Sequence, residues 1–418
     1  SNAYVPDFVP DVPGSRSIAA RALVCASLAN GSNTVLNAPK CDDTDAISYC
    51  LQHLAADVFV SGKKTELTSW SELDPRGVLN CNASGTTMRF IAALSILTDK
   101  DLVLSGTPRL LDRPMAGLND VLTTVGKSVI DNNGTRIISG ATRIPAELTV
   151  DASTSGQFVS GLLMALAAAG QSTVLRAVNP VSIPFITMTI QVMRSFGADI
   201  EMGRDGSDLV FHIAGTGYKR TEFFVEPDIM SANYFLAAAA ITGKSVFIPG
   251  IASDTIQGDI EFVYALEKMG AKIEFIDGGI RSSIPTGARL RGTQVDLAQM
   301  PDMSLTIAAL AAVAEGPTTM TSARILQYKE SDRLNVIVTE LTKLGATVAV
   351  SDDLNDVTIT PGQALLDAAI DTYEDHRVAM AFGLLTLLNP HITINNPECV
   401  TKTWPDFFQE LERYRNLG

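Results

Sequence analysis

The 418-residue chain is poor in several residue types, and each shortage excludes a class of protein. It has five cysteines (Cys25, Cys41, Cys50, Cys81 and Cys399), an odd number, and no Cys-x-x-Cys pair. Scattered cysteines are typical of reduced thiols in a cytoplasmic protein, and they argue against a disulfide framework or a zinc site. The Ala-rich segments break at Gly or a polar residue after about a dozen positions, which is too short for a membrane span.

Positive charge is also scarce. The chain has 32 Lys and Arg against 46 Asp and Glu, so its formal net charge is −14. We therefore expect no nucleic-acid partner and no membrane partner. A local cationic pocket for a small anionic substrate stays possible in such a chain. The length predicts two domains, and a hydrophobic fraction of 46% suits large cores.

What the sequence does contain is a long repeat. Six Ala/Leu-rich segments each end in a short polar break and continue into a β-like run. The breaks lie 67, 72, 73, 73 and 73 residues apart, at Gly31, Thr98, Gly170, Gly243, Gly316 and Asn389. Four of the six are Gly, the residue that most easily ends a helix in the left-handed conformation. Five amphipathic helical segments, such as VIVTELTKLG, alternate with them. Six units of two helices and several short strands predict two domains of three units each.

The starts of the buried helices differ between the two halves of the repeat. In the first three units they carry small or hydroxyl residues with arginines nearby, at Ser17, Ser84 and Gly156 with Arg16, Arg21 and Arg89. In the last three units they carry carboxylates, at or next to Asp228, Asp302 and Asp375. An Asp at a helix start is most simply a cap. Across six equivalent starts, the split indicates anion-binding donors in one half and carboxylates in the other.

The segment YKESDRL, residues 328–334, packs four charges into seven residues. Its simplest role is a helix start capped by Ser331 or Asp332. The alternative is that its charges contact a substrate.

The order of the motifs decides between these readings. The chain contains PGSRSIAARA, SGTTMR, GTPRLLDRPM, SGQFVSGLLM, DTIQGD, MPDMSLTIAALAAVAEG, YKESDRL, TYEDHRVAMA and KTWPDFF in this order. Over residues 12 to 412 it resembles the 3-phosphoshikimate 1-carboxyvinyltransferase (EPSP synthase) family of the enolpyruvyl transferase superfamily. The resemblance implies an α/β fold of two domains, each with three βαβαββ repeats around buried parallel helices (an inverse α/β barrel). It implies an N-terminal domain over residues 13–227 for acceptor and phosphate binding. The C-terminal domain, residues 1–12 and 228–418, would carry acid–base carboxylates and enolpyruvate-binding cations.

The activity that the resemblance implies is a cytoplasmic transferase reaction of the shikimate pathway, in aromatic amino acid biosynthesis. The enolpyruvyl group of phosphoenolpyruvate passes to the 5-hydroxyl of shikimate 3-phosphate by addition and elimination, and phosphate is released. The resemblance implies no cofactor and no metal, and we expect a monomer whose two domains close on the substrates.

The site residues follow from the resemblance, motif by motif. Shikimate 3-phosphate would be bound by Arg16, Ser17, Arg21, Ser155, Gln157, Ser182, Asp302 and Lys329. Phosphoenolpyruvate would be bound by Arg16, Gly85, Arg113, Gln157, Arg333, Arg377 and Lys402. The catalytic residues would be Asp302 and Glu330, as the acid–base pair, with Arg16. Asp375 and His376 would orient Arg377.

Four positions depart from the family pattern. Arg16 replaces a lysine that contacts both substrates, and Gly156, Phe185 and Ile325 replace polar residues that face the acceptor. Arginine is wider than lysine and does not readily release a proton, so we expect Gly156 to make room for Arg16. These changes leave open a divergent enolpyruvyl transferase for a related cyclic alcohol, or a non-catalytic anion-binding paralogue. The segment before PGS is short, and we expect it to lack a strand that completes the second domain.

Overall fold

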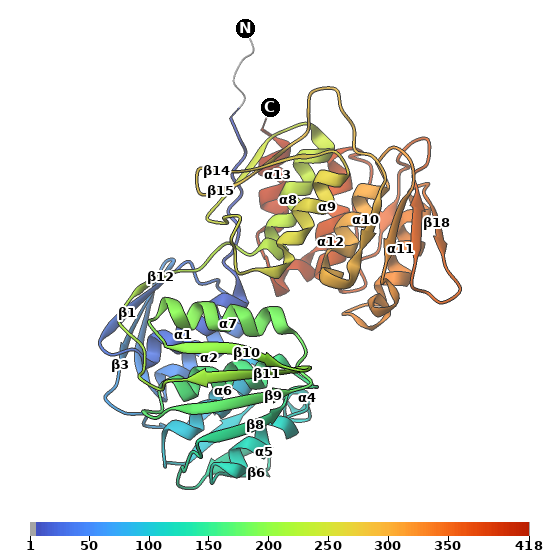
Figure 1. Cartoon of the computed structure of the whole chain (residues 1–418). Helices are drawn as coiled ribbons and strands as arrows, with labels where there is room; N and C mark the ends of the chain where they lie inside the picture. Colours follow the sequence, from blue (N-terminus) through green and yellow to red (C-terminus); the bar gives the residue numbers. More distant parts are fainter. Residues whose placement is uncertain (1–5, 418) are drawn as a thin grey trace. The chain divides into compact units, whose positions relative to one another are not determined.

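The computed structural model describes residues 6–417, so the parts of the predictions that fall on residues 1–5 and 418 lie outside it. The chain divides into two compact units (Figure 1). We call Gly14–Glu226 the N-terminal unit; the C-terminal unit joins the described residues up to Pro13 with those from Pro227 onwards. The chain therefore passes between the units twice. Within residues 6–417, no helix is long and apolar enough to cross a membrane.

The N-terminal unit contains three four-stranded sheets of one design. In each sheet a parallel pair of strands is extended by an antiparallel hairpin. The first sheet consists, in spatial order, of β12 (Glu222–Phe224), β1 (Ser32–Leu36), β3 (Lys64–Ser69) and β2 (Ala56–Ser61). The second consists of β4 (Val78–Asn80), β5 (Leu102–Ser105), β7 (Thr135–Ser139) and β6 (Ser128–Asn132). The third consists of β8 (Glu147–Asp151), β9 (Thr173–Val178), β11 (Asp208–Ile213) and β10 (Ile200–Asp205).

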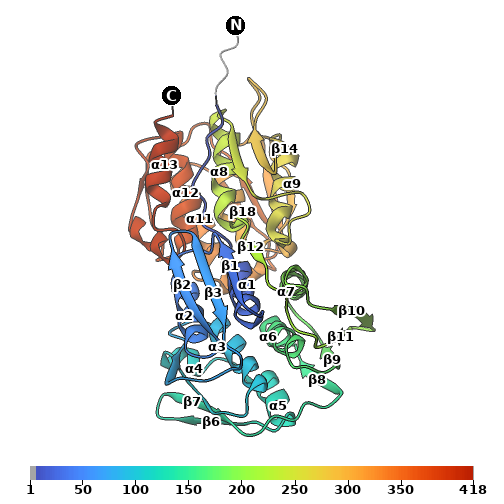
Figure 2. The ribbon, with the colours of Figure 1, turned by 90° about the vertical axis from the view of Figure 1, so that its left-hand side faces the viewer.

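The helices of the N-terminal unit follow the predicted alternation. The buried helices are α1 (Arg16–Leu28), α3 (Gly85–Leu94) and α6 (Gly156–Ala167), which pack beside one another (Figure 2). The amphipathic helices are α2 (Asp42–Gln52), α5 (Ala116–Thr124) and α7 (Ile183–Ser195), with a short α4 (Pro108–Leu111). In α6 every residue except Gln157 is buried, because the helix is apolar on all sides.

The C-terminal unit repeats this design with a reduced last copy. Its helices are α8 (Ile229–Thr242), α9 (Glu261–Lys268), α10 (Ser304–Ala311), α11 (Arg333–Lys343), α12 (His376–Gly383) and α13 (Phe407–Arg415). Its complete sheet consists of β16 (Gln294–Asp296), β17 (Thr318–Thr321), β19 (Val357–Thr360) and β18 (Thr347–Val350). Two smaller sheets consist of β13 (Val246–Pro249), β15 (Gly279–Ser283) and β14 (Lys272–Ile276), and of β20 (Ala369–Ile370) with β21 (Thr393–Ile394). The last copy therefore has the parallel pair and no antiparallel hairpin among the described residues.

The expectation that the short N-terminal segment lacks the completing strand is wrong. Phe8 forms a parallel bridge with Val246 at the edge of β13. Its amide donates to the Ser245 carbonyl at 2.8 Å, and its carbonyl accepts from the Phe247 amide at 2.9 Å. One residue thus supplies the parallel partner that β12, β4, β8 and β16 supply in the other sheets.

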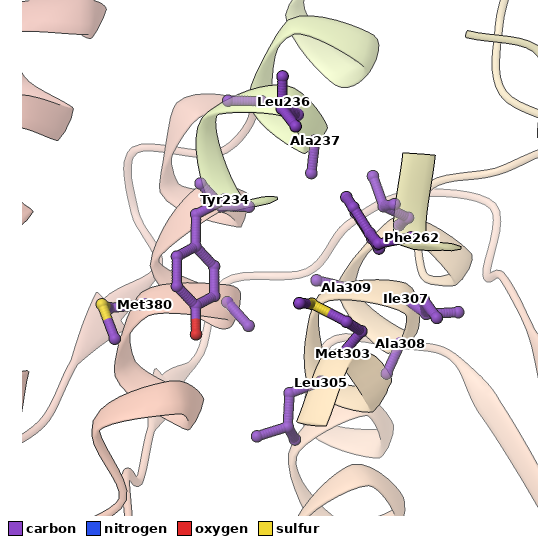
Figure 3. Close-up of a cluster of buried hydrophobic side chains, with 14 of the residues drawn as sticks. Tyr234, Leu236, Ala237, Phe262, Met303, Leu305, Ile307, Ala308, Ala309 and Met380 are labelled. Carbon is purple, nitrogen blue, oxygen red and sulfur yellow. The ribbon is translucent and has the colours of Figure 1, made fainter. Parts of the chain in front are cut away.

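The core of the C-terminal unit lies between its buried helices. Figure 3 shows Tyr234 of α8 close to Met380 of α12, with Leu305 and Ile307 of α10 in the same cluster. The predicted glycine positions are left-handed, with φ of 78° at Gly243, where α8 ends. The other buried helices end two or more residues before their breaks, and after α3 and α12 a 3₁₀ turn occupies the interval.

Candidate active site

Arg333, the first residue of α11, is the centre of the charged cluster in the C-terminal unit. Its side chain is fully buried, and three carboxylates surround it. The guanidinium donates to Asp302 at 3.1 Å, to Glu330 at 2.5 Å and to Asp375 at 2.9 Å. The structure thus brings the predicted acid–base pair together on one arginine.

Two lysines extend this cluster towards solvent. The Lys329 ammonium lies 3.4 Å from Asp302, and the half-exposed Lys402 lies 3.7 Å from Glu330. Burial alone would raise the pKa of Asp302, but the nearby Arg377, Lys329 and Arg333 outweigh it and lower that pKa. Asp302 is therefore ionised at neutral pH in this arrangement.

The start of α12 holds the third predicted cation. Asp375 caps the helix by accepting from the Arg377 amide at 3.0 Å. The Arg377 guanidinium donates to the Met230 carbonyl and to the Tyr234 hydroxyl, each at 3.1 Å. Burial would lower the pKa of Arg377, and Tyr234, Asp302 and Asp228 more than offset it. Asp375 thus contacts the Arg377 amide and the Arg333 side chain, and its orienting role towards the Arg377 side chain stays a prediction.

His376 follows Asp375 and is buried without a hydrogen bond. Among the described residues neither ring nitrogen has a partner, and its Nδ1 lies 3.9 Å from Asp375. Burial and the neighbouring Arg377 lower the pKa of His376 to about 3. The imidazole is therefore neutral, and its orienting role towards Arg377 stays a prediction.

The three predicted aspartates at helix starts do not all act as caps. Asp228 caps α8 by accepting from the Met230 amide at 3.1 Å, and Asp375 caps α12. Asp302 lies in the 3₁₀ turn Pro301–Met303 before α10 and makes no cap hydrogen bond. In YKESDRL the cap of α11 is Asp332, which accepts from the Asn335 amide at 3.1 Å, while the Ser331 hydroxyl donates to Asp375 at 2.7 Å.

Asp259 is a site residue that the sequence reasoning did not single out. It lies in the 3₁₀ turn Gly258–Ile260, inside the motif DTIQGD. Burial, together with the charges of Asp302 and Asp228, raises its pKa to about 6. The motif was the available signal, but its residues alone did not reveal that Asp259 lies close enough to Asp302 and Asp228 to feel their charges.

In the N-terminal unit, Arg21 is buried on the second turn of α1. It donates to the Thr189 hydroxyl at 2.6 Å and to the Ser17 carbonyl at 2.8 Å. The Phe90 ring lies 5.3 Å away and the Phe185 ring 5.8 Å away. Burial lowers the pKa of Arg21 to about 10. Within residues 6–417, no carboxylate forms an ion pair with it, which leaves a buried positive charge that favours an anion.

Arg89, which the sequence placed near the anion-binding helix starts without assigning it a substrate, joins the starts of α3 and α6. It donates to the Ser155 hydroxyl at 3.3 Å, to Gln157 Oε1 at 2.8 Å and to the Pro114 carbonyl at 3.0 Å. Burial and the nearby Arg113 lower its pKa to about 10. Its position four residues after Gly85, one turn into a buried helix, was the signal for a residue on the face of the site.

Gly85 makes room for Arg113. A Cβ atom at Gly85 would lie 2.2 Å from the Arg113 Nη1 and 2.8 Å from its Cζ. Only a residue without a side chain allows the guanidinium to lie against the first turn of α3. Gly85 is a residue predicted to bind phosphoenolpyruvate. In this structure the group that lies closest to it is the guanidinium of Arg113, which is also predicted to bind phosphoenolpyruvate.

Arg16 and Gly156 do not form the expected pair. Arg16 lies 3.6 Å from Asp43 of α2 in a half-exposed ion pair. A Cβ at Gly156 would meet the Val181 carbonyl at 3.0 Å and the Ser182 Cβ at 3.3 Å. Gly156 therefore makes room for the turn at Ser182, which has a φ of 55°, and the expectation that it makes room for Arg16 is wrong.

The predicted residues thus fall into two groups. The N-terminal unit carries Arg16, Ser17, Arg21, Gly85, Arg113, Ser155, Gln157 and Ser182. The C-terminal unit carries Asp302, Lys329, Glu330, Arg333, Arg377 and Lys402. The first group offers hydroxyls and arginines, and among the described residues Arg21 and Arg113 have no carboxylate partner while Arg16 pairs with Asp43, an arrangement that suits anions. The second offers cations beside carboxylates, which suits binding an anion and moving a proton. In the part of the chain that the structure describes, no group of three or more His, Cys, Asp or Glu could hold a metal ion.

Comparisons with known proteins agree on one family. The family model described as EPSP synthase (3-phosphoshikimate 1-carboxyvinyltransferase) matches residues 8–411. The 3-phosphoshikimate 1-carboxyvinyltransferase of Photobacterium profundum is 38% identical over 411 residues, 96% of this chain and 95% of that protein. The enzyme of the same name from Yersinia pestis is 38% identical, over 98% of this chain and 96% of its own.

Solved structures show the same fold. EPSP synthase from Acinetobacter baumannii superposes with a TM-score of 0.83 at 23% identity, over 97% of this chain and 95% of that one. The enolpyruvyl transferase NikO from Streptomyces tendae superposes with a TM-score of 0.69 at 17% identity, over 98% of this chain and 94% of that one. Motifs in order, a repeated fold and full-length matches agree, and the chain belongs to the EPSP synthase (3-phosphoshikimate 1-carboxyvinyltransferase) family.

Proposed function

We propose that this protein transfers the enolpyruvyl group of phosphoenolpyruvate to the 5-hydroxyl of shikimate 3-phosphate and releases phosphate. In the addition step, the hydroxyl oxygen bonds to C2 of phosphoenolpyruvate, the hydroxyl loses its proton and the methylene carbon gains one. In the elimination step, the new methyl group loses a proton, the C2–phosphate bond breaks and phosphate leaves. The observation that carries the proposal is the shared contact of Asp302 and Glu330 with buried Arg333.

The proposed roles follow the charge of each residue. Asp302 and Glu330 move the protons, and Arg16 supports the charge that develops on the phosphate. Phosphoenolpyruvate is bound by Arg16, Gly85, Arg113, Gln157, Arg333, Arg377 and Lys402. Shikimate 3-phosphate is bound by Arg16, Ser17, Arg21, Ser155, Gln157, Ser182, Asp302 and Lys329. The lack of carboxylate partners for Arg21, Arg89 and Arg113 among the described residues supports anion binding by the N-terminal unit.

The cluster around Arg333 supports a link between substrate binding and proton transfer. Arg377, Lys329 and Arg333 hold the pKa of Asp302 below its ordinary value. A bound anion would draw these cations towards itself and weaken their hold on Asp302 and Glu330. The pKa of Asp302 would then rise, which suits a group that must accept and return a proton near neutral pH. In this proposal, phosphoenolpyruvate activates the pair that acts on it.

A phosphate-release assay tests the function. Phosphoenolpyruvate is supplied with shikimate 3-phosphate, with shikimate lacking the 3-phosphate, and with other cyclic alcohols. We expect release with shikimate 3-phosphate, loss of about 10²–10⁴-fold in kcat for Glu330→Gln and Asp302→Asn, and little change for the exposed Tyr264→Phe. No release with shikimate 3-phosphate would overturn the proposal. Release with a different cyclic alcohol only would favour a divergent acceptor, which the altered positions Arg16, Gly156, Phe185 and Ile325 would then explain.

A further inference from the structure

The turn that leads into α12 has an unusual backbone. Tyr373 and Glu374 are consecutive, and both have a φ of 56°, in the left-handed region. Residues with a side chain adopt this region at an energetic cost, and two in succession need surrounding contacts to hold them. The next residue is Asp375, which caps α12 and binds Arg333. The position of this turn therefore sets the position of two cations of the site.

One end of the turn is fixed by the site itself. Asp375 accepts from Arg333 Nε at 2.9 Å, from Arg333 Nη2 at 3.2 Å and from the Ser331 hydroxyl at 2.7 Å. These contacts come from the start of α11 and the residues just before it. They hold Asp375, but they do not reach the residues with the left-handed backbone.

The other end of the turn is fixed by a contact outside the site. The Tyr373 hydroxyl donates to Glu340 at 2.9 Å. Glu340 is fully buried, and the Lys343 ammonium neutralises it from 2.7 Å. Lys343 also donates to Asp371 at 3.2 Å, which ties the strand before the turn to the same carboxylate. Glu340 thus contacts Tyr373 directly, and through Lys343 it is linked to Asp371, two residues before Tyr373.

Both contacts arise from one face of one helix. Arg333 and Glu340 are seven residues apart, about two turns of α11, so their side chains point the same way. α11 therefore holds the turn at Asp375 with its first residue and at Tyr373 with its eighth. Tyr373 is 40% exposed, so its burial contributes less than that of a core residue and the hydroxyl contact is the main tie.

We propose that Glu340 and Tyr373 are positioning residues that hold the turn at Tyr373 and Glu374 and thereby orient Asp375, Arg333 and Arg377 for the enolpyruvate-binding side. The inference rests on the proposed function for its effect on phosphoenolpyruvate. The position of the turn itself is independent of that function. Neither residue touches the substrate in this proposal, and neither is catalytic.

The test uses Tyr373→Phe, which removes one hydroxyl and leaves the exposed ring in place. Hydrogen exchange reports the turn directly, through the Asp375 amide, which donates to the Thr372 carbonyl at 2.8 Å. We expect exchange of residues 372–379 to become roughly 10-fold faster, with the rest of the chain unchanged. The matched control is Tyr264→Phe, which removes a hydroxyl from an exposed tyrosine on α9 and should exchange like the wild type. In kinetics, we expect the KM for phosphoenolpyruvate to rise about 5- to 20-fold, with a smaller change in the KM for the acceptor.

A second variant separates positioning from a general loss of structure. Glu374→Gly makes the left-handed conformation easy to adopt, so the turn should no longer need the contact. We expect Tyr373→Phe combined with Glu374→Gly to return the KM for phosphoenolpyruvate to within about twofold of Glu374→Gly alone. Unchanged hydrogen exchange in Tyr373→Phe, an equal rise of both KM values, or no rescue by Glu374→Gly would each overturn the inference. A wild-type protein without turnover would contradict the proposed function, and the hydrogen-exchange result would still decide the role of the turn.

Discussion

Arg333 places a positive charge in the interior of the C-terminal unit. A fully buried guanidinium would be unfavourable alone, and Asp302, Glu330 and Asp375 neutralise it. The three partners differ in exposure, since Asp375 is fully buried while Asp302 and Glu330 are partly open to solvent. Asp375 is thus the partner that is shielded from solvent. Asp302 and Glu330 are accessible from solvent, so a bound anion can replace them as partners of Arg333.

Asp259 makes the stability of the C-terminal unit fall as the pH rises. Its pKa in the folded protein is about 6 against an ordinary value of 3.8, so the folded state favours the protonated carboxyl. The associated stability is present below pH 3.8 and is lost as the pH rises through 6. At higher pH the ionised Asp259 faces Asp302 and Asp228, and it destabilises the unit.

We therefore predict that Asp259→Asn raises the urea midpoint of unfolding at pH 8 and changes it much less at pH 4.5. The amide keeps the shape and cannot ionise, so the gain should follow the ionisation of the native carboxyl. The exposed Asp254→Asn on the preceding loop is the control and should have no such pH-dependent gain. An equal gain at both pH values would show that repulsion between carboxylates is not its cause.

At the scale of single residues, motifs predicted the charged cluster better than local pattern did. The order of the motifs brought Asp302, Glu330 and Arg333 together as candidates, and the structure places them in contact. Arg89 was found only as an arginine near the helix starts, and Asp259 was not found, because their surroundings depend on burial and on neighbours distant in sequence. The space next to Gly156 is taken by Ser182 and not by Arg16, and this too is decided by the packing of the folded chain.

At the scale of elements, the start of α3 depends on Gly85, whose lack of a side chain leaves room for Arg113. Arg113 lies where a Cβ of residue 85 would be, and its guanidinium is the exposed end of a flexible side chain. An added methyl group should therefore displace the arginine while the helix keeps its place.

We predict that Gly85→Ala changes the melting temperature little and raises the KM for phosphoenolpyruvate several-fold, through displacement of Arg113. The double variant with Arg113→Ala should be no worse than Arg113→Ala alone, because the methyl group then displaces nothing. Gly203→Ala on β10 is the control, since its nearest neighbour would lie 4.0 Å away. Additive losses in the double variant would mean that Gly85 acts on the substrate directly.

The repeat predicted most of the elements, and it missed those that break its period. The period-based reading identified five of the amphipathic helices but not α13, because the charged sequence of α13 follows a shortened last copy. The helix starts lie within two residues of the positions that the period gave. The single bridge at Phe8 is too short to leave a strand pattern in the sequence.

At the scale of the whole molecule, the N-terminal segment belongs to the core of the C-terminal unit. Phe8 is 1% exposed and packs against Phe235 and edge-on against Tyr414. The Arg413 guanidinium lies 4.3 Å from its ring and donates to the Val9 carbonyl at 2.8 Å. The two ends of the described chain therefore meet in one unit.

We predict that Phe8→Ala destabilises the C-terminal unit by about 3–5 kcal/mol and leaves the N-terminal unit unchanged, because each unit has its own core. Hydrogen exchange resolved by peptide, in moderate urea, measures the two units separately. The matched control is Phe196→Ala, which empties a fully buried site in the N-terminal unit and should have the opposite pattern. Loss of protection in both units for either variant would mean that the units unfold as one.

The bridge between Phe8 and Val246 also affects the order in which the two units can fold during translation. The segment up to Pro13 is synthesised before the whole of the N-terminal unit, and its partners Val246 and Tyr414 are synthesised only after that unit. The N-terminal unit has all of its strands once Phe224 has emerged and can fold while translation continues. The first segment, with an apolar ring exposed, must wait for almost the full length of the chain. A circular permutant that joins the two ends and opens between Glu226 and Pro227 would remove this wait and make both units continuous.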